Sequence, residues 1–428
     1  MKCYDFEKIK NKDTFWKLIY NPSIPEDVEK RVRKILSDVR EKGDTALLQY
    51  IRRFDGTSLN ASTLEVSSGE FSEAKKSVDP QFYKTVKRIA KNIETYQKKL
   101  LLKSSMVSKN GKQLGSLVRA VQSVGIYIPG GSAPLVSTVF MSVIPAQVAG
   151  VKDIIIASPP NKKTASINPY ILAACEFLGI RKVYKMGGAH AIGAMAYGTP
   201  SVRPVDIIAG PGNIYVACAK RQVFGHVGID MVAGPSEVMI VADTKQSVSM
   251  IAADLLAQAE HDPMARTFLV TTSQSYAQDV KKALRAQLLL LKRADVAKRS
   301  IAERCFAFIV KDLKYAPDVI NMIGPEHLEL LCEKPHAILS NVTRAGAVFV
   351  GPWTPEPVGD YVAGPSHVLP TGGTARFFSP LSAMTFQKTM SYLEYTRNAL
   401  KRERSDIAYI AELEGLDAHK RSLEARFK

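Results

Sequence analysis

Short apolar runs alternate with alanine-rich stretches along the middle of the chain, and this alternation constrains the fold most. Between residues 124 and 243 the runs DIIIASPP, VDIIAGPGN and EVMIVAD are separated by stretches such as INPYILAACEFLGI. Short apolar runs bounded by turn residues are typical of buried parallel strands, and the stretches between them have the composition of helices. The pattern therefore predicts βαβ units around a parallel sheet.

The same alternation resumes further along the chain, with TFLVTTS at 267–273, CFAFIV at 305–310 and GAVFVG at 346–351. We therefore expect a second α/β layer. The 428 residues are enough for two or three domains, each with its own core.

The segments that flank this alternation have other patterns. Apolar residues from Val86 to Leu100 recur at intervals of three and four, which predicts an amphipathic helix packed on one face. Asn110-Gly111 predicts a turn between two short strands. After about residue 385 the pattern is helical to the end, where Gly415 is expected to separate two short helices and Asp417 to cap the second.

The net charge of +17, from 58 basic and 41 acidic residues, raises the question of nucleic-acid binding. The lysines are dispersed, and where they gather, at 75–103 and 401–426, they alternate with apolar positions as on solvated helix faces. No recognition motif accompanies them, so we expect no nucleic-acid partner.

Cysteine usage and hydropathy indicate the compartment. The five cysteines are widely spaced and form no C-x-x-C pair, which favours a reducing environment over a disulfide framework or a thiolate zinc site. No run of about eighteen apolar residues occurs, and the N-terminal residues lack the apolar region of an export signal. We therefore expect a cytoplasmic protein that does not bind membranes.

The stretch AQAEHDP places Gln258 and His261 on one face at the end of a helix-like run that begins near Val248. A residue before a proline is disfavoured in helical conformation, so the helix is expected to stop by Asp262. His261 then either complements the negative end of the helix or forms one corner of a metal site. These residues alone favour the first interpretation, with Gln258 facing solvent.

The adjacent pair Glu326–His327 in GPEHLELL has the residue types of a base and a proton carrier. Neighbouring side chains diverge, so they can serve different atoms of one substrate. A helix start after Pro325, with Glu326 near its positive end, explains the pair equally well.

The segment 351–377 is so rich in proline and glycine that it is expected to trace a fixed loop without regular structure. Asp360 and His367 are its candidate ligands or substrate contacts, because function concentrates on loops held by a scaffold. A set of one glutamine, one aspartate and two histidines from distant positions would suit a catalytic zinc site, although spacing alone does not join them.

Three glycine-rich stretches are candidates for binding a nucleotide: IPGGSAPL at 128–135, MGGAHAIGAMAYG at 186–198 and AGPGN at 209–213. None matches G-x-G-x-x-G with an acidic residue about twenty positions later, so the Rossmann fingerprint is absent. The helix start in GGAHAIGA could bind a phosphate, but ordinary turn glycines explain it equally well.

Taken together, six segments resemble the histidinol dehydrogenase family. They are, in chain order, YIPGGSAPLVSTV, GPGNIYVACAKRQVFGHVGIDMVAGPSEVMIVAD, DLLAQAEHDP, PEHLEL, GPWTPEPVGDYVAGPSHVLPTGGTARF and EGLDAHKRSLEAR. They run from about residue 124 to the C-terminus in the family's order. The resemblance implies a homodimeric zinc enzyme that oxidises L-histidinol to L-histidine through a bound aldehyde, using two NAD⁺, in the last steps of histidine biosynthesis.

The resemblance also implies a fold. It comprises two incomplete Rossmann-like α/β domains with parallel sheets, plus small, mainly helical terminal domains that are exchanged in a domain-swapped dimer. The implied division is a helical segment over 1–24, a first α/β domain over 25–126 and 236–375, a second over 127–235, and a helical tail over 376–428 that reaches the partner subunit. The missing G-x-G-x-x-G agrees with incomplete domains.

Matching positions imply a role for each site residue. The implied zinc ligands are Gln258, His261, Asp360 and, across the dimer, His419. Glu326 is implied as the base and His327 as the proton carrier. The implied substrate contacts are Ser236, His327, Glu414 and the zinc ligands, with His367 a weaker candidate. The implied NAD contacts are Tyr127, His190 and Asn213.

The chemistry of these residue types supports the resemblance. Taking a primary alcohol to a carboxylate needs two hydride removals with a water addition between them, so the site must deprotonate an alcohol and then an aldehyde hydrate. The adjacent Glu326–His327 pair supplies both needs. Cys175 and Cys218 lie in helix-like runs and Cys305 opens a strand, so we expect a hydrate in place of a thioester. A break at Gly415 would let Glu414 and His419 reach one site, since five residues apart on an unbroken helix they would point apart.

One position departs from the family pattern, because His190 stands where glutamine is usual. Imidazole offers one hydrogen bond in place of an amide's donor and acceptor, and it titrates near neutral pH. We therefore expect weaker NAD binding with an added pH dependence.

Two alternatives are weighed against this interpretation. A paralogous zinc and NAD dehydrogenase acting on another small primary alcohol would lose substrate contacts such as Glu414, which is intact here. A non-enzymatic binding protein would have little reason to hold Glu326–His327 together with four ligand-type residues.

Overall fold

The computed structural model describes residues 1–9, 24–130 and 135–428. The chain divides into two compact units. The first comprises Met1–Leu100 and Gln122–Phe386, and the second comprises Leu101–Val121 and Gln387–Lys428. Each unit is described by itself.

A six-stranded parallel sheet forms one part of the first unit. Its strand order is β1 (Lys2–Asp5), β11 (Cys305–Ile309), β10 (Arg266–Thr271), β9 (Glu237–Ala242), β12 (His327–Leu331) and β13 (Ala347–Val350). Every pairing in it is parallel, which confirms the second α/β layer.

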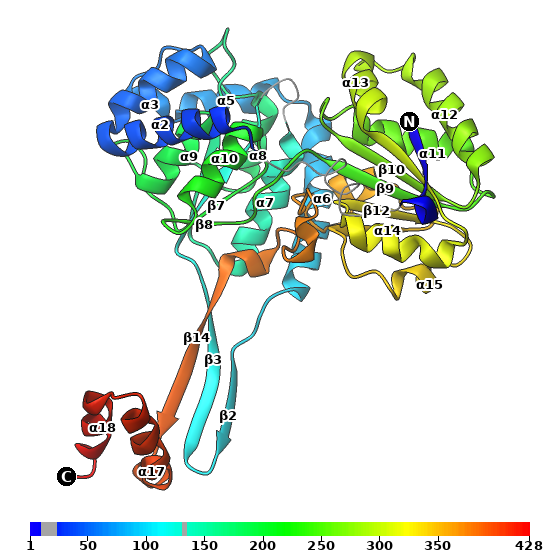
Figure 1. The fold of residues 1–428 in the computed structure, drawn as a ribbon. Helices are drawn as coiled ribbons and strands as arrows, with labels where there is room; N and C mark the ends of the chain where they lie inside the picture. The colour runs from blue at the N-terminus through cyan, green and yellow to red at the C-terminus, as the bar shows by residue number, and fades with distance from the viewer. Residues whose placement is uncertain (10–23, 131–134) are drawn as a thin grey trace. The chain divides into compact units, whose positions relative to one another are not determined.

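Alternate residues of these strands pack against two sets of helices. Val238 and Ile240 face the core formed by α11 (Val248–Ala259), α12 (Gln274–Leu288) and α13 (Ala294–Arg304). Met239 and Val241 face the core formed with α14 (Ala316–Ile323) and α15 (Pro335–Leu339). Figure 1 shows the two sets on opposite faces of the sheet. Burial of both faces explains why these strands are continuous apolar runs.

A five-stranded parallel sheet forms the other part. Its order is β6 (Val183–Lys185), β5 (Asp153–Ser158), β4 (Ser123–Tyr127), β7 (Ile207–Ala209) and β8 (Gly228–Ile229). The chain runs outward from β4 through β5 to β6 and then returns to place β7 on the other side of β4. The predicted βαβ units are confirmed, and the strand order reverses between β4 and β7.

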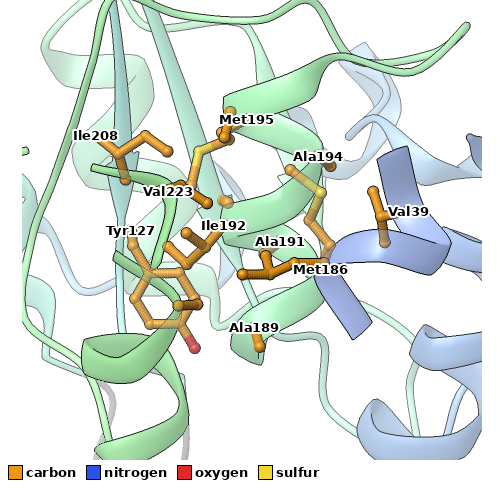
Figure 2. Packing of buried hydrophobic residues seen from close by; sticks show 14 of the residues in the cluster. Val39, Tyr127, Met186, Ala189, Ala191, Ile192, Ala194, Met195, Ile208 and Val223 are labelled. Atoms are coloured by element: carbon orange, nitrogen blue, oxygen red, sulfur yellow. The ribbon is translucent and has the colours of Figure 1, made fainter. Parts of the chain in front are cut away.

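Helices connect and cover this sheet. They are α2 (Glu26–Lys42), α3 (Asp44–Tyr50), η2 (Ile51–Asp55), α7 (Val136–Ala149), α8 (Pro169–Phe177), α9 (Gly188–Tyr197) and α10 (Ile214–Val223). Figure 2 shows Val39 of α2 directed at α9, and the Tyr127 ring beside Ile192. Alanine and glycine dominate α9, so α2 can approach it closely: a Cβ atom on Gly193 would lie 3.2 Å from Leu36.

Shorter elements complete the first unit. They are η1 (Phe6–Lys8), α4 (Ala61–Leu64), α5 (Ser68–Ser77), α6 (Pro80–Lys99), η3 (Leu313–Tyr315), α16 (Glu356–Tyr361), η4 (Thr374–Arg376) and η5 (Ala383–Phe386). The amphipathic helix predicted up to Leu100 is confirmed as α6, with Val86 and Ile93 buried. No helix in the described part of the chain is long and apolar enough to cross a membrane.

The second unit is an antiparallel sheet followed by two helices. The sheet order is β14 (Gln387–Tyr395), β3 (Lys112–Ala120) and β2 (Ser105–Lys109), and the helices are α17 (Arg397–Leu413) and α18 (Asp417–Glu424). The turn at Asn110-Gly111 is confirmed, with both residues at positive φ. The break at Gly415 is also confirmed, but Asp417 is the first residue of α18 and does not cap it, since Leu416 is the cap residue.

Two predicted helical segments contain strands instead. Gln387–Tyr395 extends the sheet as β14, because it pairs along its whole length with Lys112–Ala120. Lys2–Asp5 forms β1, because it pairs with β11 at the edge of the six-stranded sheet. Residues 10–23 of the predicted segment 1–24 lie outside the described residues. The division into domains over 25–126 with 236–375 and over 127–235 stays a prediction.

Candidate active site

Charged side chains are buried at one edge of the six-stranded sheet, where three strands begin. Glu237 and Arg266 are the first residues of β9 and β10, and Glu326 directly precedes His327, the first residue of β12. All four are buried. Parallel strands begin at a common edge, so the topology brings these residues together. The alternative of a helix start at Glu326 is wrong, since the segment leads into β12.

The backbone of Glu237 holds both members of the Glu326–His327 pair. Its amide donates to Oε2 of Glu326 at 2.8 Å. Nδ1 of His327 lies 3.0 Å from its carbonyl oxygen. The same Nδ1 lies 3.8 Å from Oε2 of Glu326. The two side chains are therefore fixed close together. Adjacent positions in the sequence did not by themselves predict this, since neighbouring side chains diverge.

Burial and neighbouring charges shift the pKa values of the pair. Burial raises the pKa of Glu326 to about 8. Burial alone would lower the pKa of His327, but the negative charges of Glu356, Glu326 and Asp360 raise it well above its ordinary value. A carboxyl group that titrates near neutral pH beside a proton-holding imidazole suits proton transfer.

The end of α11 lies beside this pair. The helix ends at Ala259, which confirms the stop predicted before Pro263. Gln258 is buried and does not face solvent as the simplest interpretation expected. With its amide nitrogen turned toward Glu356, that nitrogen lies 3.0 Å from both carboxylate oxygens.

Three side chains form a cluster with the geometry of a metal site. His261, Glu356 and Asp360 each offer one ligand atom, and these atoms lie within 4.8 Å of one another. Asp360 also faces the catalytic-type pair, with Oδ1 3.6 Å from Nε2 of His327. Imidazole nitrogen and carboxylate oxygen are donors that zinc accepts, so the residues present fit this ion.

The pKa values of His261 and Asp360 agree with metal binding, whereas burial raises the pKa of Glu356 to about 7. Burial lowers the pKa of His261, which favours the neutral imidazole that a metal needs. Burial alone would raise the pKa of Asp360, but the nearby imidazoles of His327, His367 and His261 outweigh it and hold the pKa below its usual value. Both groups therefore favour their ligating forms.

Glu356 was missed by the sequence analysis. The prolines and glycines around it predicted a loop without regular structure, but residues 356–361 form the short helix α16, with Pro355 as its cap residue. Glu356 and Asp360 are four residues apart and so share one face of this helix. That spacing is the signal that could have joined Glu356 to Asp360.

Further buried charged side chains contact the residues of the site. Nη1 of Arg266 lies 3.2 Å from Oε1 of Glu237. Oε1 of Glu329 accepts the backbone amide of Glu356 at 3.0 Å. Burial raises the pKa of Glu329 to about 8 and that of the neighbouring Asp254 to about 6. Glu237 and Glu329 are acidic residues within apolar runs of the sequence. Acidic side chains are rarely buried unless they are paired, so this pattern indicates buried, paired charges.

The other substrate positions lie around this centre or in the second unit. Ser236 precedes β9, and its carbonyl oxygen accepts the Arg266 amide at 2.9 Å, so it lies at the same sheet edge. Nδ1 of His367 lies 3.1 Å from the Asp360 carbonyl oxygen, and its Nε2 lies 3.1 Å from Oγ1 of Thr138. Glu414 is the C-terminal cap residue of α17 and His419 lies in α18, both within the second unit.

Two of the predicted cofactor contacts lie at the carboxyl edge of the five-stranded sheet. Tyr127 ends β4, and Asn213 is the cap residue of α10, which follows β7. Ligands of open α/β sheets bind outside the carboxyl ends of strands where the strand order reverses, as it does between β4 and β7. Oδ1 of Asn213 accepts the amides of Tyr215 and Val216, and its exposed amide nitrogen can face a ligand.

His190, the third predicted cofactor contact, is buried in α9. Its Nε2 lies 3.0 Å from Oδ2 of Asp55, and the ring stacks with Tyr50 and Phe54. Asp55 was not identified from the sequence, because the contact spans 135 positions. A direct contact of His190 with NAD stays a prediction.

An unpaired polar atom marks the same carboxyl edge. Ser158 ends β5, and its buried hydroxyl has no hydrogen-bond partner among the described residues. Oη of Tyr127 accepts the amide of Gly188 at 3.1 Å. A reversal of strand order, the exposed Asn213 at the start of α10 and this hydroxyl fit a dinucleotide, even though the Rossmann fingerprint is absent.

The fold and the site together define a class of protein. Two parallel α/β sheets, with a carboxylate–imidazole pair beside a metal-type cluster at one of them, are the framework of a metal-dependent α/β enzyme. A family model described as histidinol dehydrogenase matches residues 21–427. The chain belongs to the histidinol dehydrogenase family, which confirms the resemblance.

Individual relatives match along nearly their full lengths. A histidinol dehydrogenase of Caldanaerobacter subterraneus subsp. tengcongensis is 45% identical over 428 residues, covering 100% of this chain and 99% of its own. One of Bacillus subtilis is 45% identical over 402 residues, covering 94% and 93%. A crystal structure of histidinol dehydrogenase from Elizabethkingia anophelis is 35% identical with a TM-score of 0.92, covering 100% and 98%.

Proposed function

We propose that this protein oxidises L-histidinol to L-histidine through L-histidinal, with zinc and NAD, as the last steps of histidine biosynthesis in the cytoplasm. The observation that carries the proposal is the buried Glu326–His327 pair beside the cluster of His261, Glu356 and Asp360. Membership of the family along residues 21–427 supports it.

The chain's own residues would hold the cofactors. Gln258, His261 and Asp360 would bind zinc together with the partner subunit's His419, and Tyr127, His190 and Asn213 would contact NAD. When bound, zinc supplies a positive charge that holds the imidazole and amine of the substrate, and NAD accepts the hydride. Ser236 and Glu414 would hold the substrate in place.

Glu326 and His327 would move the protons of both oxidation steps. The carboxylate of Glu326, with its pKa of about 8, can take a proton from water or an aldehyde hydrate near neutral pH. His327 lies between Glu326 and Asp360, with nitrogens 3.8 Å and 3.6 Å from their carboxylates. Its imidazole can therefore relay protons between these carboxylates and away from the reacting atoms.

The cysteines support a hydrate in preference to a thioester. Cys175 and Cys305 are fully buried, and burial raises the pKa of each thiol. A catalytic cysteine must ionise readily, and these two are held in their neutral form. Water activated by Glu326 is therefore the better nucleophile.

The low burial of the second unit supports the proposal of a homodimer. Of its residues only Ala399, Ala411 and Leu423 are buried, while Val107 and Leu393 are 67% and 68% exposed. Exposed apolar patches of this kind mark surfaces that another chain covers. A second copy on this surface would support the proposed contribution of His419 to its partner's site.

The proposal is tested by turnover. Purified protein should form two molecules of NADH for each molecule of L-histidinol, lose this activity with a chelator and regain it with zinc. The alternative is a paralogous dehydrogenase of another small primary alcohol. Turnover of such an alcohol without turnover of histidinol would reject the main proposal and favour that alternative.

A further inference from the structure

A buried ion pair lies behind the switch point of the five-stranded sheet. Lys220 of α10 is 2% exposed and forms an ion pair with Asp230, which follows β8 and is 7% exposed. Burying two charges costs more free energy than their attraction returns unless further hydrogen bonds satisfy them. The pair therefore calls for a role beyond packing.

Both charges converge on one peptide segment, Gly210. Oδ2 of Asp230 accepts the Gly210 amide at 2.8 Å, and Nζ of Lys220 donates to the Gly210 carbonyl oxygen at 2.9 Å. Oδ1 of Asp230 also accepts the Met231 amide at 2.6 Å. The donor and the acceptor of one glycine are thus both held by charged groups, which are the stronger hydrogen-bond partners.

Gly210 is the point where the backbone leaves β7 beside β4. Its φ is +110°, and a Cβ atom there would lie 2.2 Å from the carbonyl oxygen of Tyr127. Only glycine permits this conformation and this close approach. The ion pair therefore holds Gly210, the start of the 210–213 loop, in close contact with the end of β4.

The loop ends at Asn213, the cap residue of α10. Tyr127 on one side and Asn213 on the other are the residues proposed to contact NAD at the reversal of strand order. The ion pair touches neither of them, but the segment that it holds joins them. A shift of Gly210 would move Asn213 relative to Tyr127.

We propose that Lys220 and Asp230 are positioning residues for the dinucleotide site, which they shape by clamping Gly210. This inference rests on the proposed function for the identity of the dinucleotide. Because both charged groups belong to the chain itself, the clamp would preorganise the loop and lower the entropy that binding must overcome.

The test removes both charges together, so that neither remains buried alone. In the double variant Lys220→Met/Asp230→Asn, the zinc-loaded protein is titrated with NADH by fluorescence. The Kd for NADH should rise about tenfold or more, and the KM for NAD should rise with it. The KM for histidinol and the zinc content should stay within about twofold of the parent. If the double variant does not fold, Lys220→Gln/Asp230→Asn is used, which also removes both charges but keeps hydrogen-bonding groups at both positions.

The matched control is another ion pair of the same sheet. Lys182 and Asp153 lie where strands β6 and β5 begin, at the amino ends of the strands. Nζ of Lys182 lies 2.8 Å from Oδ1 of Asp153. Lys182→Met/Asp153→Asn should leave the Kd for NADH within about twofold of the parent. The clamp is rejected if the Lys220/Asp230 variant folds and binds NADH like the parent, or if the control weakens binding equally. A parent that turns over no histidinol but binds NADH overturns the proposed function alone, whereas a parent that binds no NADH overturns both.

Discussion

The imidazole of His190 and the carboxylate of Asp55 form a buried pair, with Nε2 3.0 Å from Oδ2. The same Oδ2 accepts the amide of Gly187 at 3.0 Å, at the start of α9. The pair thus connects the turn η2 with the first residues of a helix at the proposed cofactor edge.

The first prediction concerns this pair. Asp55→Ala should lower the free energy of unfolding by about 3 kcal/mol, because two buried donors lose their acceptor. Calorimetry measures the loss. His190→Gln is the control, since its amide can still donate to Asp55, and its loss should be below about 1 kcal/mol. If Asp55→Ala and His190→Gln lower the free energy of unfolding equally, the hydrogen bonds to Asp55 do not contribute to stability.

His190→Gln also tests the cofactor role predicted from the sequence. If His190 weakens NAD binding, the glutamine variant should have a lower KM for NAD, with less dependence on pH between about 6 and 9. An unchanged KM throughout this range would show that His190 acts through Asp55 alone.

The second prediction is a pH profile. Since burial raises the pKa of Glu326 to about 8, its basic form becomes populated as the pH rises toward that value. The ratio kcat/KM should therefore increase with pH up to about 8 and then level off. Glu326→Gln should lose this limb and about 10²- to 10⁴-fold of kcat. Glu333→Gln, at an exposed acid that pairs with Lys245, should leave the profile unchanged.

The third prediction concerns stability in acid. Asp38 accepts hydrogen bonds from Lys42 at 2.7 Å and from Tyr50 at 2.6 Å, and these hold its pKa below the ordinary value of 3.8. Its contribution to folding is therefore present above pH 3.8 and is lost as the pH falls toward the depressed pKa.

Thermal unfolding of Asp38→Asn should reveal this dependence. Its Tm should be lower than that of the parent near neutral pH, and the difference should shrink below pH 3.8. Glu26→Gln, which removes an exposed pair with Lys30, should change the Tm little at any pH. A difference for Asp38→Asn that grows in acid would contradict the assignment.

The fourth prediction tests the shared site. Mixing inactive Gln258→Ala and His419→Ala proteins should restore activity in heterodimers, because one of their two sites then has both residues. Random exchange should give about one quarter of the parent activity. Gln258→Ala mixed with Glu326→Gln is the control and should stay inactive, since both changes lie in the same chain's half of the site. If the first mixture regains no more activity than this control, His419 does not cross to the partner's site.

Local patterns predicted the parallel strands because each is a continuous apolar run, which can be recognised in the sequence without knowledge of the neighbouring strands. They did not predict β14, since Gln387–Tyr395 becomes a strand only by pairing with Lys112–Ala120. The motif AQAEHDP marked Gln258 and His261 as candidates, but these residues alone favoured a helix end, and only the family resemblance implied that they are zinc ligands. Asp55 could not be found, because nothing near it in sequence marks its contact with His190.

The pairing of β3 with β14 has a consequence for synthesis of the chain. The hairpin formed by β2 and β3 leaves the ribosome early, but its other neighbour becomes available only when translation reaches Gln387. Until then β3 presents an open edge that can pair with other nascent chains. A nascent chain stalled before that residue would carry this edge exposed, so chaperone binding during translation should concentrate on the hairpin.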